Sequence, residues 1–254
     1  MEFETFNKIK SLDDLAFLLN VAPNKLNNIL EKIGYNVAYI PREIEKRGGG
    51  FRKLNIPSRE LRTIQEKILR KILEKISMPE CLHGGRKGKS IITNASQHLK
   101  QKFILKIDVK DFFPSIRFEK IGKIFLDLGF NRGISNYLRF LTTMDYCLPQ
   151  GAPTSPLLSN LAFLHIDKDL YNLSRKCRLK YTRYFDDIAI SGNRIPDSLE
   201  KKFYKIIEIK GFKINYKKSK KYSKKEKPII TGLMIDGKIA LPEEQIQEDR
   251  KSVV

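Results

Sequence analysis

Hydrophobic residues recur at spacings of three and four in several stretches, and this spacing places side chains on one face of an α-helix. Residues 11–34 show the pattern twice, on either side of Pro23, and predict two short helices. A stronger pattern follows Ser58, whose side chain is suited to capping a helix that reaches about Ile76. Further helices are predicted at 118–128, ended by Gly129, at 155–176, begun by a Ser155 cap and Pro156, and at 197–211, with Asp197 and Glu200 as a capping box.

Alternating polar and apolar residues predict strands in the remaining stretches. These are two strands within 37–57, one at 103–109, two in a hairpin at 181–191, a short one at 213–216, and a final hairpin that turns at Asp236-Gly237. On the strand 103–109, alternation directs Lys106 and Asp108 away from the face on which Leu105 and Ile107 pack. The order of the elements is that of an α+β fold, with helices on one face of an antiparallel sheet.

The composition indicates which chemical class of partner the protein binds. The chain has 49 Lys and Arg against 29 Asp and Glu, a net charge of +20 and a pI near 9.8. So large a positive excess predicts a polyanionic partner, most simply nucleic acid. The lysine-rich run 217–227 is the obvious candidate for contacting phosphates. The sequence contains neither a long apolar run nor a signal peptide, which argues against a membrane partner. The three widely spaced cysteines predict a reduced, cytoplasmic protein.

The helical pair at 11–34 has two interpretations. Two short amphipathic helices joined by a tight break are typical of a helix-turn-helix DNA reader. They are also compatible with a helical extension that packs against the rest of the fold, and this second interpretation is favoured.

Two adjacent carboxylates stand between β-prone runs in the stretch LKYTRYFDDIAISG. The tip of a plain hairpin would carry Asn-Gly or Asp-Gly, whereas Asp186 and Asp187 repel each other unless a cation lies between them. Asp108 is the candidate partner, because its strand can lie beside this hairpin and bring the three carboxylates to one end of the sheet. Oxygen-rich clusters of this kind suit Mg²⁺, and two such ions about 3.5–4 Å apart support in-line phosphoryl transfer. A basic chain with such a site is expected to be a nucleotidyl transferase that acts on nucleic acid.

Several stretches resemble the motifs of reverse transcriptases. YFDD at 184–187 is similar to their Tyr-x-Asp-Asp box, IDVKDFFPSI to their first catalytic motif, and LPQGAPTSPLLSNL to the loop and helix that follow. The resemblance extends from about Arg47 to Leu241. NASQH at 94–98 and Ile-Thr-Gly at 230–232 are similar to signatures of the bacterial retron type, and PSRELRTIQEKILRKIL is typical of retron enzymes and their group II intron relatives.

The resemblance implies catalytic and metal-binding roles for the three aspartates. Asp108, Asp186 and Asp187 would hold two Mg²⁺ ions, for which Mn²⁺ could substitute. Lys218, or its neighbour Lys217, would act as general acid toward the pyrophosphate leaving group, although a solvated lysine run explains either of them equally well.

The resemblance also implies a set of nucleotide-binding residues. Arg52 would clamp the triphosphate, a task suited to a planar forked donor, with help from Lys46 or Arg47 unless these are plain solvated charges. Phe113 would exclude a 2′-hydroxyl and so favour deoxynucleotides, or is an ordinary core residue. The remaining assignments are the backbone at Asp111 and Phe112 for phosphates, Gln150 and Gly151 for the nascent base pair, and Asn94 and His98 as structural or RNA-contacting residues.

Two features depart from the family pattern. Phe185 stands where retron enzymes usually carry alanine, so its ring is expected to press on the primer end or the nucleotide and to alter speed or fidelity. The segment after Gly232 is too short for the helical thumb that follows in the family. The chain is therefore expected to be truncated there or to depend on a partner for its grip on the template and primer.

The resulting expectation is a right-hand polymerase with fingers and palm and little or no thumb. The predicted boundaries are a helical extension at 1–36, fingers at 37–102, a palm at 103–241 with a fingers insertion near 115–150, and a thumb remnant or tail at 242–254. The resemblance implies that the enzyme makes branched DNA (msDNA) from dNTPs on its own noncoding RNA, holds the RNA–DNA hybrid, and acts in antiviral defence beside an effector protein. The alternatives are a group II intron-like or other bacterial reverse transcriptase, and an RNA- or DNA-binding protein that does not polymerise.

Overall fold

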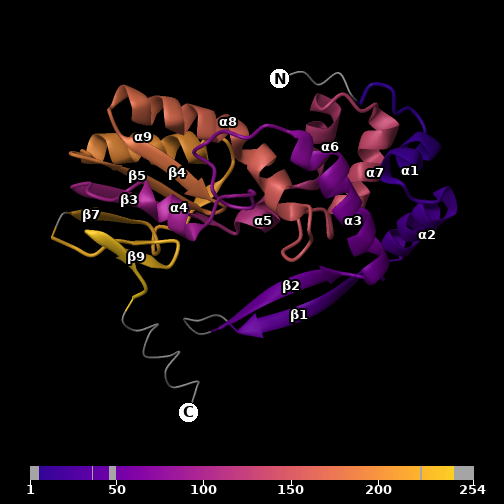
Figure 1. Cartoon of the computed structure of the whole chain (residues 1–254), viewed down its shortest axis with the longest axis horizontal. Coiled ribbons are helices and arrows are strands. Elements are labelled where there is room, and N and C mark those ends of the chain that lie inside the picture. Colours follow the sequence, from indigo (N-terminus) through magenta and orange to yellow (C-terminus); the bar gives the residue numbers. More distant parts are fainter. Residues whose placement is uncertain (1–5, 36, 46–49, 224, 243–254) are drawn as a thin grey trace, which may run out of the picture. The chain divides into compact units, whose positions relative to one another are not determined.

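The computed structural model describes residues 6–35, 37–45, 50–223 and 225–242 (Figure 1). The chain divides into two compact units. The first consists of Met1–Ser77 and Phe113–Ala162, and the second of Met78–Phe112 and Phe163–Val254. The chain passes from one unit to the other at three points: between Ser77 and Met78, between Phe112 and Phe113 within the short helix α5 (Phe112–Ser115), and inside the long helix α8 (Ser155–Lys176).

The first unit is a cluster of helices with a two-stranded antiparallel ribbon. Its helices are α1 (Leu12–Leu19), α2 (Pro23–Gly34), α3 (Arg59–Lys71) with a 3₁₀ turn at Leu73–Lys75, α6 (Phe118–Asp127) and α7 (Arg132–Thr142). The ribbon pairs β1 (Tyr39–Glu45) with β2 (Phe51–Pro57). The helices α1 and α2 contact α3, and α2 also contacts α7 (Figure 1). This packing favours the helical extension over a separate DNA-reading module.

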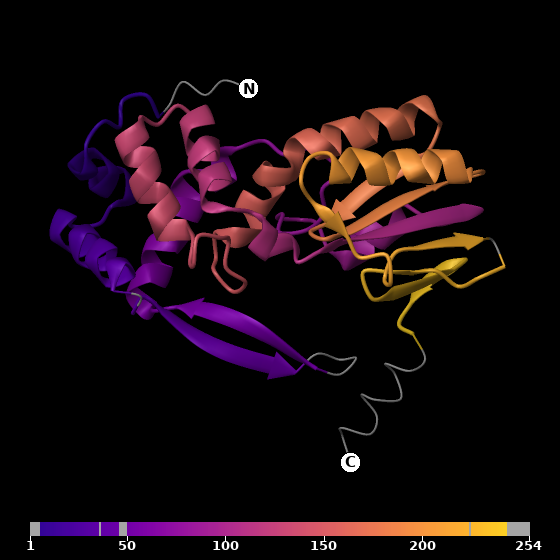
Figure 2. The ribbon, with the colours of Figure 1, turned by 180° about the vertical axis from the view of Figure 1, so that it is seen from behind.

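The second unit is built on a five-stranded antiparallel sheet. The order is β4 (Lys180–Tyr184), β5 (Asp187–Gly192), β3 (Phe103–Lys110) and β6 (Lys213–Ile214), and β7 (Lys220–Ser223) also pairs with β3. The helix α9 (Asp197–Glu208) and the C-terminal part of α8 cover one face (Figures 1 and 2). On the other face lie α4 (Ile91–Ser96) and a small sheet of β8 (Ile229–Ile230), β9 (Leu233–Asp236) and β10 (Lys238–Ala240).

Both faces of the main sheet are therefore covered, and the expectation of helices on one face is only partly met. Ile104 shares the face of Lys106 and Asp108, yet it is 2% exposed and packs with Ala95 of α4, Ala189 of β5 and the β8–β9 hairpin. Alternation along one strand assigns residues to two faces, but it does not reveal that a later segment will return to cover the second face.

Two local predictions were wrong in detail. Asp197 does not cap its helix, because the helix starts at Asp197 after Pro196, and the carboxylates of Asp197 and Glu200 instead contact Lys221 Nζ. Ser155 is likewise the first residue inside its helix rather than the capping residue before it, and its hydroxyl donates to Pro149 O at 2.7 Å. In both cases a tertiary partner takes the side chain that the local pattern assigns to the helix end.

The lysine-rich run 217–227 is partly structured. β7 lies inside it and pairs with β3, Lys221 contacts Asp197 and Glu200, and Lys220 contacts Glu226. The charge of these two lysines is therefore locally balanced. Among the residues that the structure describes, no helix is long and apolar enough to cross a membrane.

Candidate active site

The sheet of the second unit places two of the three predicted aspartates opposite each other and the third beside them in the chain. β3 pairs with β5 so that Asp108 lies directly opposite Asp187, and Val109 N donates to Asp186 O at 2.9 Å. Residues opposite each other on paired strands project to the same face. The strand 103–109 thus lies beside the hairpin, as the sequence predicted, and both carboxylates occupy the face that also carries Lys106.

The hairpin that carries Asp186 has a two-residue tip. Tyr184 pairs with Asp187, which leaves Phe185 and Asp186 to make the turn. Phe185 has φ +55°, in the left-handed region that favours glycine. Its ring contacts Tyr184 edge to face, with centroids 5.1 Å apart. A non-glycine residue in this conformation requires support from its surroundings.

A buried ion pair supplies part of that support. Arg183 is 1% exposed, and its guanidinium donates to both oxygens of Asp167 at 2.7 Å, one bond from Nε and one from Nη2. The Tyr181 hydroxyl donates to Asp167 Oδ1 at 2.6 Å. The third donor of Arg183, Nη1, reaches Phe185 O at 3.0 Å, so the network on α8 and β4 holds the carbonyl of the turn residue.

The same guanidinium also joins the turn to the end of β3. It lies 4.8 Å from the ring centroid of Phe163 and 5.6 Å from that of Phe112, which begins α5 directly after Asp111. Phe112, Phe163 and Phe212 form one aromatic cluster. The two segments that carry the aspartates are therefore fixed to a common buried group.

The segment 81–84 borders the hairpin on its other edge. His83 N donates to Arg183 O at 2.8 Å, and Arg183 N donates to Cys81 O at 2.9 Å. Gly84 approaches the turn so closely that a Cβ on it would lie 2.9 Å from Phe185 N and 2.9 Å from Phe185 Cδ1. A glycine is needed here because the backbone and ring of Phe185 occupy the space of a side chain.

The surroundings of Asp108 disfavour the ionised form of its carboxyl group. Burial, and then the neighbouring Asp187 carboxylate, raise the pKa of Asp108 above its ordinary value. Lys218, a hydrogen bond from the Asn215 side chain and Lys106 counteract that rise in pKa. Ser219 Oγ accepts from Asp108 N at 3.0 Å, and Asn215 N donates to Asp108 O at 2.8 Å. Of the two lysines proposed from sequence, Lys218 is therefore the one whose charge acts on Asp108.

Asp187 is held by a cation yet is incompletely satisfied. Lys106 Nζ lies 3.2 Å from Asp187 Oδ1, but this buried oxygen makes no hydrogen bond. Two carboxylates on paired positions, one with an unsatisfied oxygen, form a donor set that suits a hard divalent cation. Among the described residues, no three His, Cys, Asp or Glu side chains are gathered into a ready-made metal-binding group.

The 94–98 signature lies inside the protein rather than on its surface. The side chain of His98 is fully buried, with Nδ1 2.7 Å from Ser191 Oγ and Nε2 2.7 Å from Thr182 Oγ1. Burial lowers the pKa of His98 to about 3, so the ring is neutral. Asn94 is also fully buried. Of the two roles left open from sequence, this burial favours the structural one.

Of the other predicted residues, Arg52, Phe113, Gln150 and Gly151 belong to the first unit, and Asp111 and Phe112 to the second. Arg52 lies on β2, where it pairs with Ile44, and Phe113 is half-buried on α5. Gln150 O accepts from Asn55 N at 2.9 Å, and Gly151 has φ +110° with a Cβ position 3.2 Å from Asn55 O, so this position requires glycine. Asp111 is exposed with φ +48°, whereas the Phe112 side chain is buried in the core. Lys46 and Arg47 lie outside the described residues.

Sequence reasoning missed the groups that support the aspartates. Alternation placed Lys106 beside Asp108, but it gave no sign of the contact with Asp187. Arg183 precedes the box in RYFDD and Asp167 lies in the middle of a long helix, so only the tertiary fold reveals that they pair.

Comparisons with known proteins show which family this sequence is similar to. Residues 44–235 match the sequence model of the family described as reverse transcriptase (RNA-dependent DNA polymerase). The retron Ec86 reverse transcriptase of Escherichia coli is 36% identical over 215 residues, which cover 83% of this chain and 67% of that protein. The retron Mx65 reverse transcriptase of Myxococcus xanthus is 30% identical over 227 residues, 82% of this chain and 53% of that protein. The retron Se72 reverse transcriptase of Salmonella heidelberg (strain 579083-10) is 30% identical over 233 residues, which cover 90% of this chain and 61% of that protein. The chain thus spans between about half and two thirds of the length of these relatives.

Proposed function

The chain belongs to the reverse transcriptase family, an enzyme family of RNA-directed DNA polymerases, and to its retron type; from this premise we propose that it extends a primer hydroxyl with dNTPs on an RNA template. One observation links the proposal to particular residues. Asp108 and Asp187 lie opposite each other on paired strands, at the end of the sheet where the two-residue turn presents Asp186. We further propose that the first unit contributes the fingers and the second unit the palm.

Asp108, Asp186 and Asp187 would hold the divalent ions that this family uses, with Mg²⁺ as the physiological choice. The ions would supply Lewis-acid activation of the attacking hydroxyl and neutralise the triphosphate. The unsatisfied Asp187 Oδ1 and the burial of Asp108 support this assignment. A bound cation would coordinate the first and would offset the cost of ionising the second. Lys106 would balance Asp187 until an ion arrives, and Lys218 would donate a proton to the leaving pyrophosphate.

Five residues are proposed to bind the nucleotide. Arg52 would clamp the triphosphate, the backbone at Asp111 and Phe112 would contact phosphates, and Phe113 would exclude a 2′-hydroxyl. Gln150 would lie along the nascent base pair. The support here is the matched region, which includes all five positions.

We propose that the template is a noncoding RNA encoded with the protein, and that the DNA product is joined to a 2′-hydroxyl of that RNA to give msDNA. An antiviral role beside an effector protein is part of the same proposal. The support is the similarity to proteins named as retron reverse transcriptases. A branched nucleotide recovered after nuclease digestion of the product would identify the linkage, and an entirely linear product would favour the group II intron-like alternative.

The first experiment is dNTP incorporation on a primed RNA template with Mg²⁺. The parent is compared with the double variant Asp186→Asn, Asp187→Asn, and with a charge-matched control, Asp127→Asn, Asp169→Asn, in which both altered residues are exposed. Activity in the parent and the control, lost in the active-site variant, is the expected result. RNA binding without incorporation in all three would instead support the non-polymerising alternative.

A further inference from the structure

The connection between α7 and α8 carries a two-residue turn in an uncommon backbone conformation. Met144 N donates to Cys147 O at 2.9 Å, and Cys147 N donates to Met144 O at 3.0 Å. The two residues between them both have positive φ, +49° for Asp145 and +57° for Tyr146. This is the pattern of a type I′ turn, for which Asn-Gly and Asp-Gly are strongly preferred.

Tyr146 therefore occupies the position at which glycine is favoured. Its side chain is 66% exposed, so burial in the core does not compensate for the strained backbone. The ring makes one edge-to-face contact with Phe118, at a centroid distance of 5.8 Å. A residue that breaks a local rule without a gain in packing is expected where the side chain has a function.

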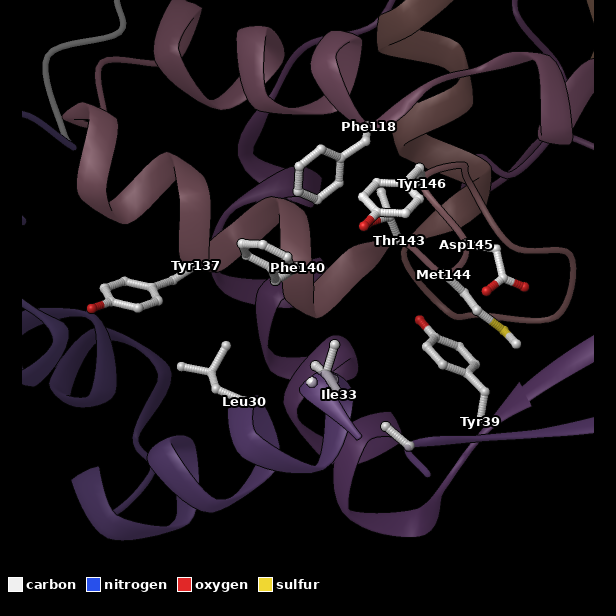
Figure 3. A pocket seen from close by; sticks show the side chains of 12 residues that line it. Leu30, Ile33, Tyr39, Phe118, Tyr137, Phe140, Thr143, Met144, Asp145 and Tyr146 are labelled. Carbon is white, nitrogen blue, oxygen red and sulfur yellow. The ribbon is translucent and has the colours of Figure 1, made fainter. Parts of the chain in front are cut away.

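The turn borders a pocket of about 480 Å³ in the first unit, a volume in the range of small-ligand sites (Figure 3). Figure 3 shows the rings of Phe118, Phe140 and Tyr146 on one side of the space, with Leu30, Ile33 and Tyr39 facing them from the other side. Tyr137 and Phe140, on α7, are 36% and 42% exposed. Aromatic side chains from four segments of the chain therefore surround one accessible space.

The charge of this pocket is opposite to that of the protein. The chain has a net charge of +20, yet none of the 12 lining residues is Lys, Arg or His, and Asp145 is the one that carries a charge. A phosphate has no cation to bind inside such a pocket. A flat, uncharged ring with hydrogen-bond donors on its edge fits both the aromatic walls and the carboxylate.

We propose that the pocket binds one unpaired base of single-stranded RNA, stacked on Tyr146, with an amino group of the base donating to the Asp145 carboxylate. The RNA partner rests on the proposed function. Proteins that recognise single-stranded RNA stack splayed bases on aromatic side chains and bind their edges. Adenine, cytosine and guanine carry an amino group and uracil does not, so the site favours the first three. Arg117, exposed and paired with Cys147 beside the turn, is placed to meet the adjoining phosphate outside the pocket.

The choice of variant follows from the turn. Tyr146→Gly removes the ring and inserts the residue that this conformation prefers, so the turn and the thermal stability are retained. The matched control is Tyr171→Ala, because Tyr171 is a 40% exposed tyrosine of α8 outside the pocket. Asp145→Asn keeps a residue that tolerates positive φ and removes only the charge.

The probe is a seven-nucleotide single-stranded RNA with 2-aminopurine at its centre, whose emission is quenched when the base stacks. The parent and Tyr171→Ala should quench it, whereas Tyr146→Gly should quench less and bind about 5- to 100-fold more weakly. The dependence of affinity on salt should be the same in all three proteins, because no phosphate contact is lost. With unmodified RNAs that vary the central base, the parent should disfavour uracil, and Asp145→Asn should reduce that preference.

The outcomes separate this site from the polymerase proposal. Equal quenching and affinity for Tyr146→Gly and Tyr171→Ala would overturn the pocket, and primer extension by both would leave the polymerase proposal intact. If adenosine monophosphate competed as effectively as the RNA, the assignment of the pocket to an RNA strand would be overturned. Binding of a lysine- or arginine-rich peptide in place of RNA would overturn it as well. If the parent neither bound RNA nor extended a primer, both proposals would be overturned.

Discussion

Asp108 is held in surroundings that oppose its own charge. Because burial and Asp187 raise its pKa, the folded state is penalised for ionising this group, and the stability present below the unfolded pKa of 3.8 is lost as the pH rises through the folded value. Asp108→Asn should therefore raise the melting temperature at pH 7 without divalent ions, by about 2–4 °C for each kcal/mol of repulsion removed. Polymerase activity should be lost in the same variant.

Thermal unfolding in EDTA and in Mg²⁺ checks this prediction. Mg²⁺ should stabilise the parent and have little effect on Asp108→Asn, since the cation relieves the same repulsion that the substitution removes. The control is Asp127→Asn, whose carboxylate is exposed and paired with Lys123. A gain in melting temperature in the control as large as in Asp108→Asn would contradict the explanation.

Arg183 is predicted to position the catalytic turn as well as to stabilise the fold. Arg183→Met leaves the Asp167 carboxylate buried without its cation, at a cost of about 3–5 kcal/mol. The triple variant Arg183→Met, Asp167→Leu, Tyr181→Phe removes all partners together, so its free energy of unfolding should return close to that of the parent. The contact with Phe185 O stays missing in the triple variant, and displacement of a catalytic group by about 1 Å can cost about 10²-fold in rate.

Urea unfolding and single-turnover incorporation distinguish the two roles of Arg183. Recovered stability with a slow chemical step is the expected combination. A triple variant that is as stable and as fast as the parent would show that Arg183 only stabilises the fold.

Single residues also mark where prediction from sequence ends. Asp108 and Asp187 were predictable because each stands in a local pattern, a strand and a hairpin, and two paired strands determine which residues lie opposite. Arg183 and Asp167 were not, because a buried ion pair depends on how a helix packs on a sheet. Tyr146 was likewise missed, since the role proposed for it rests on a backbone conformation that the sequence does not suggest.

At the scale of elements, the 94–98 signature ties α4 and the residues after it to β4 and β5. Burial lowers the pKa of His98 to about 3 and that of His83 to about 4, against an ordinary value of 6.5. As the pH falls below 6.5, both histidines become protonated in the unfolded chain but stay neutral in the folded protein. The free energy of unfolding should therefore fall by up to about 1.4 kcal/mol per pH unit for each histidine.

The test measures urea unfolding between pH 7 and pH 5. His98→Gln should be less stable than the parent at pH 7 because the ring fills a buried space between two hydroxyls, and its stability should depend less steeply on pH. The matched control is His165→Gln, which makes the same substitution at an exposed position on α8. Identical slopes for parent and His98→Gln would exclude His98 as a source of acid sensitivity.

Elements with strong local signals were predictable, and those that depend on distant partners were not. The helices α1, α2, α3, α6 and α8 and the strand β3 follow from periodicity and Gly or Pro boundaries. β7 was not predicted, because its lysine-rich sequence contains a single aromatic residue, Tyr222, and becomes a strand by pairing with β3. The capping role assigned to Asp197 failed because Lys221, inside that same strand, takes its carboxylate.

At the scale of the whole molecule, the net charge of +20 predicts RNA binding that weakens steeply with salt. The described part of 217–227 contains lysines of two kinds. Lys221 is paired with Asp197 and Glu200, whereas Lys217 is exposed and, among the described residues, forms no ion pair. A lysine already neutralised by carboxylates releases few counterions on binding, so only the second kind should contribute fully to the salt dependence.

Lys217→Gln should therefore lower the slope of log affinity against log salt by about 0.7 for a single-stranded RNA, the change for one lost phosphate contact. Lys221→Gln removes the same charge and should change the slope far less, while lowering the melting temperature because two carboxylates near the start of α9 lose their cation. Fluorescence anisotropy at four or more salt concentrations measures both slopes. Equal slopes for the two variants would mean that net charge alone, and not the pairing seen in the fold, governs how this protein meets RNA.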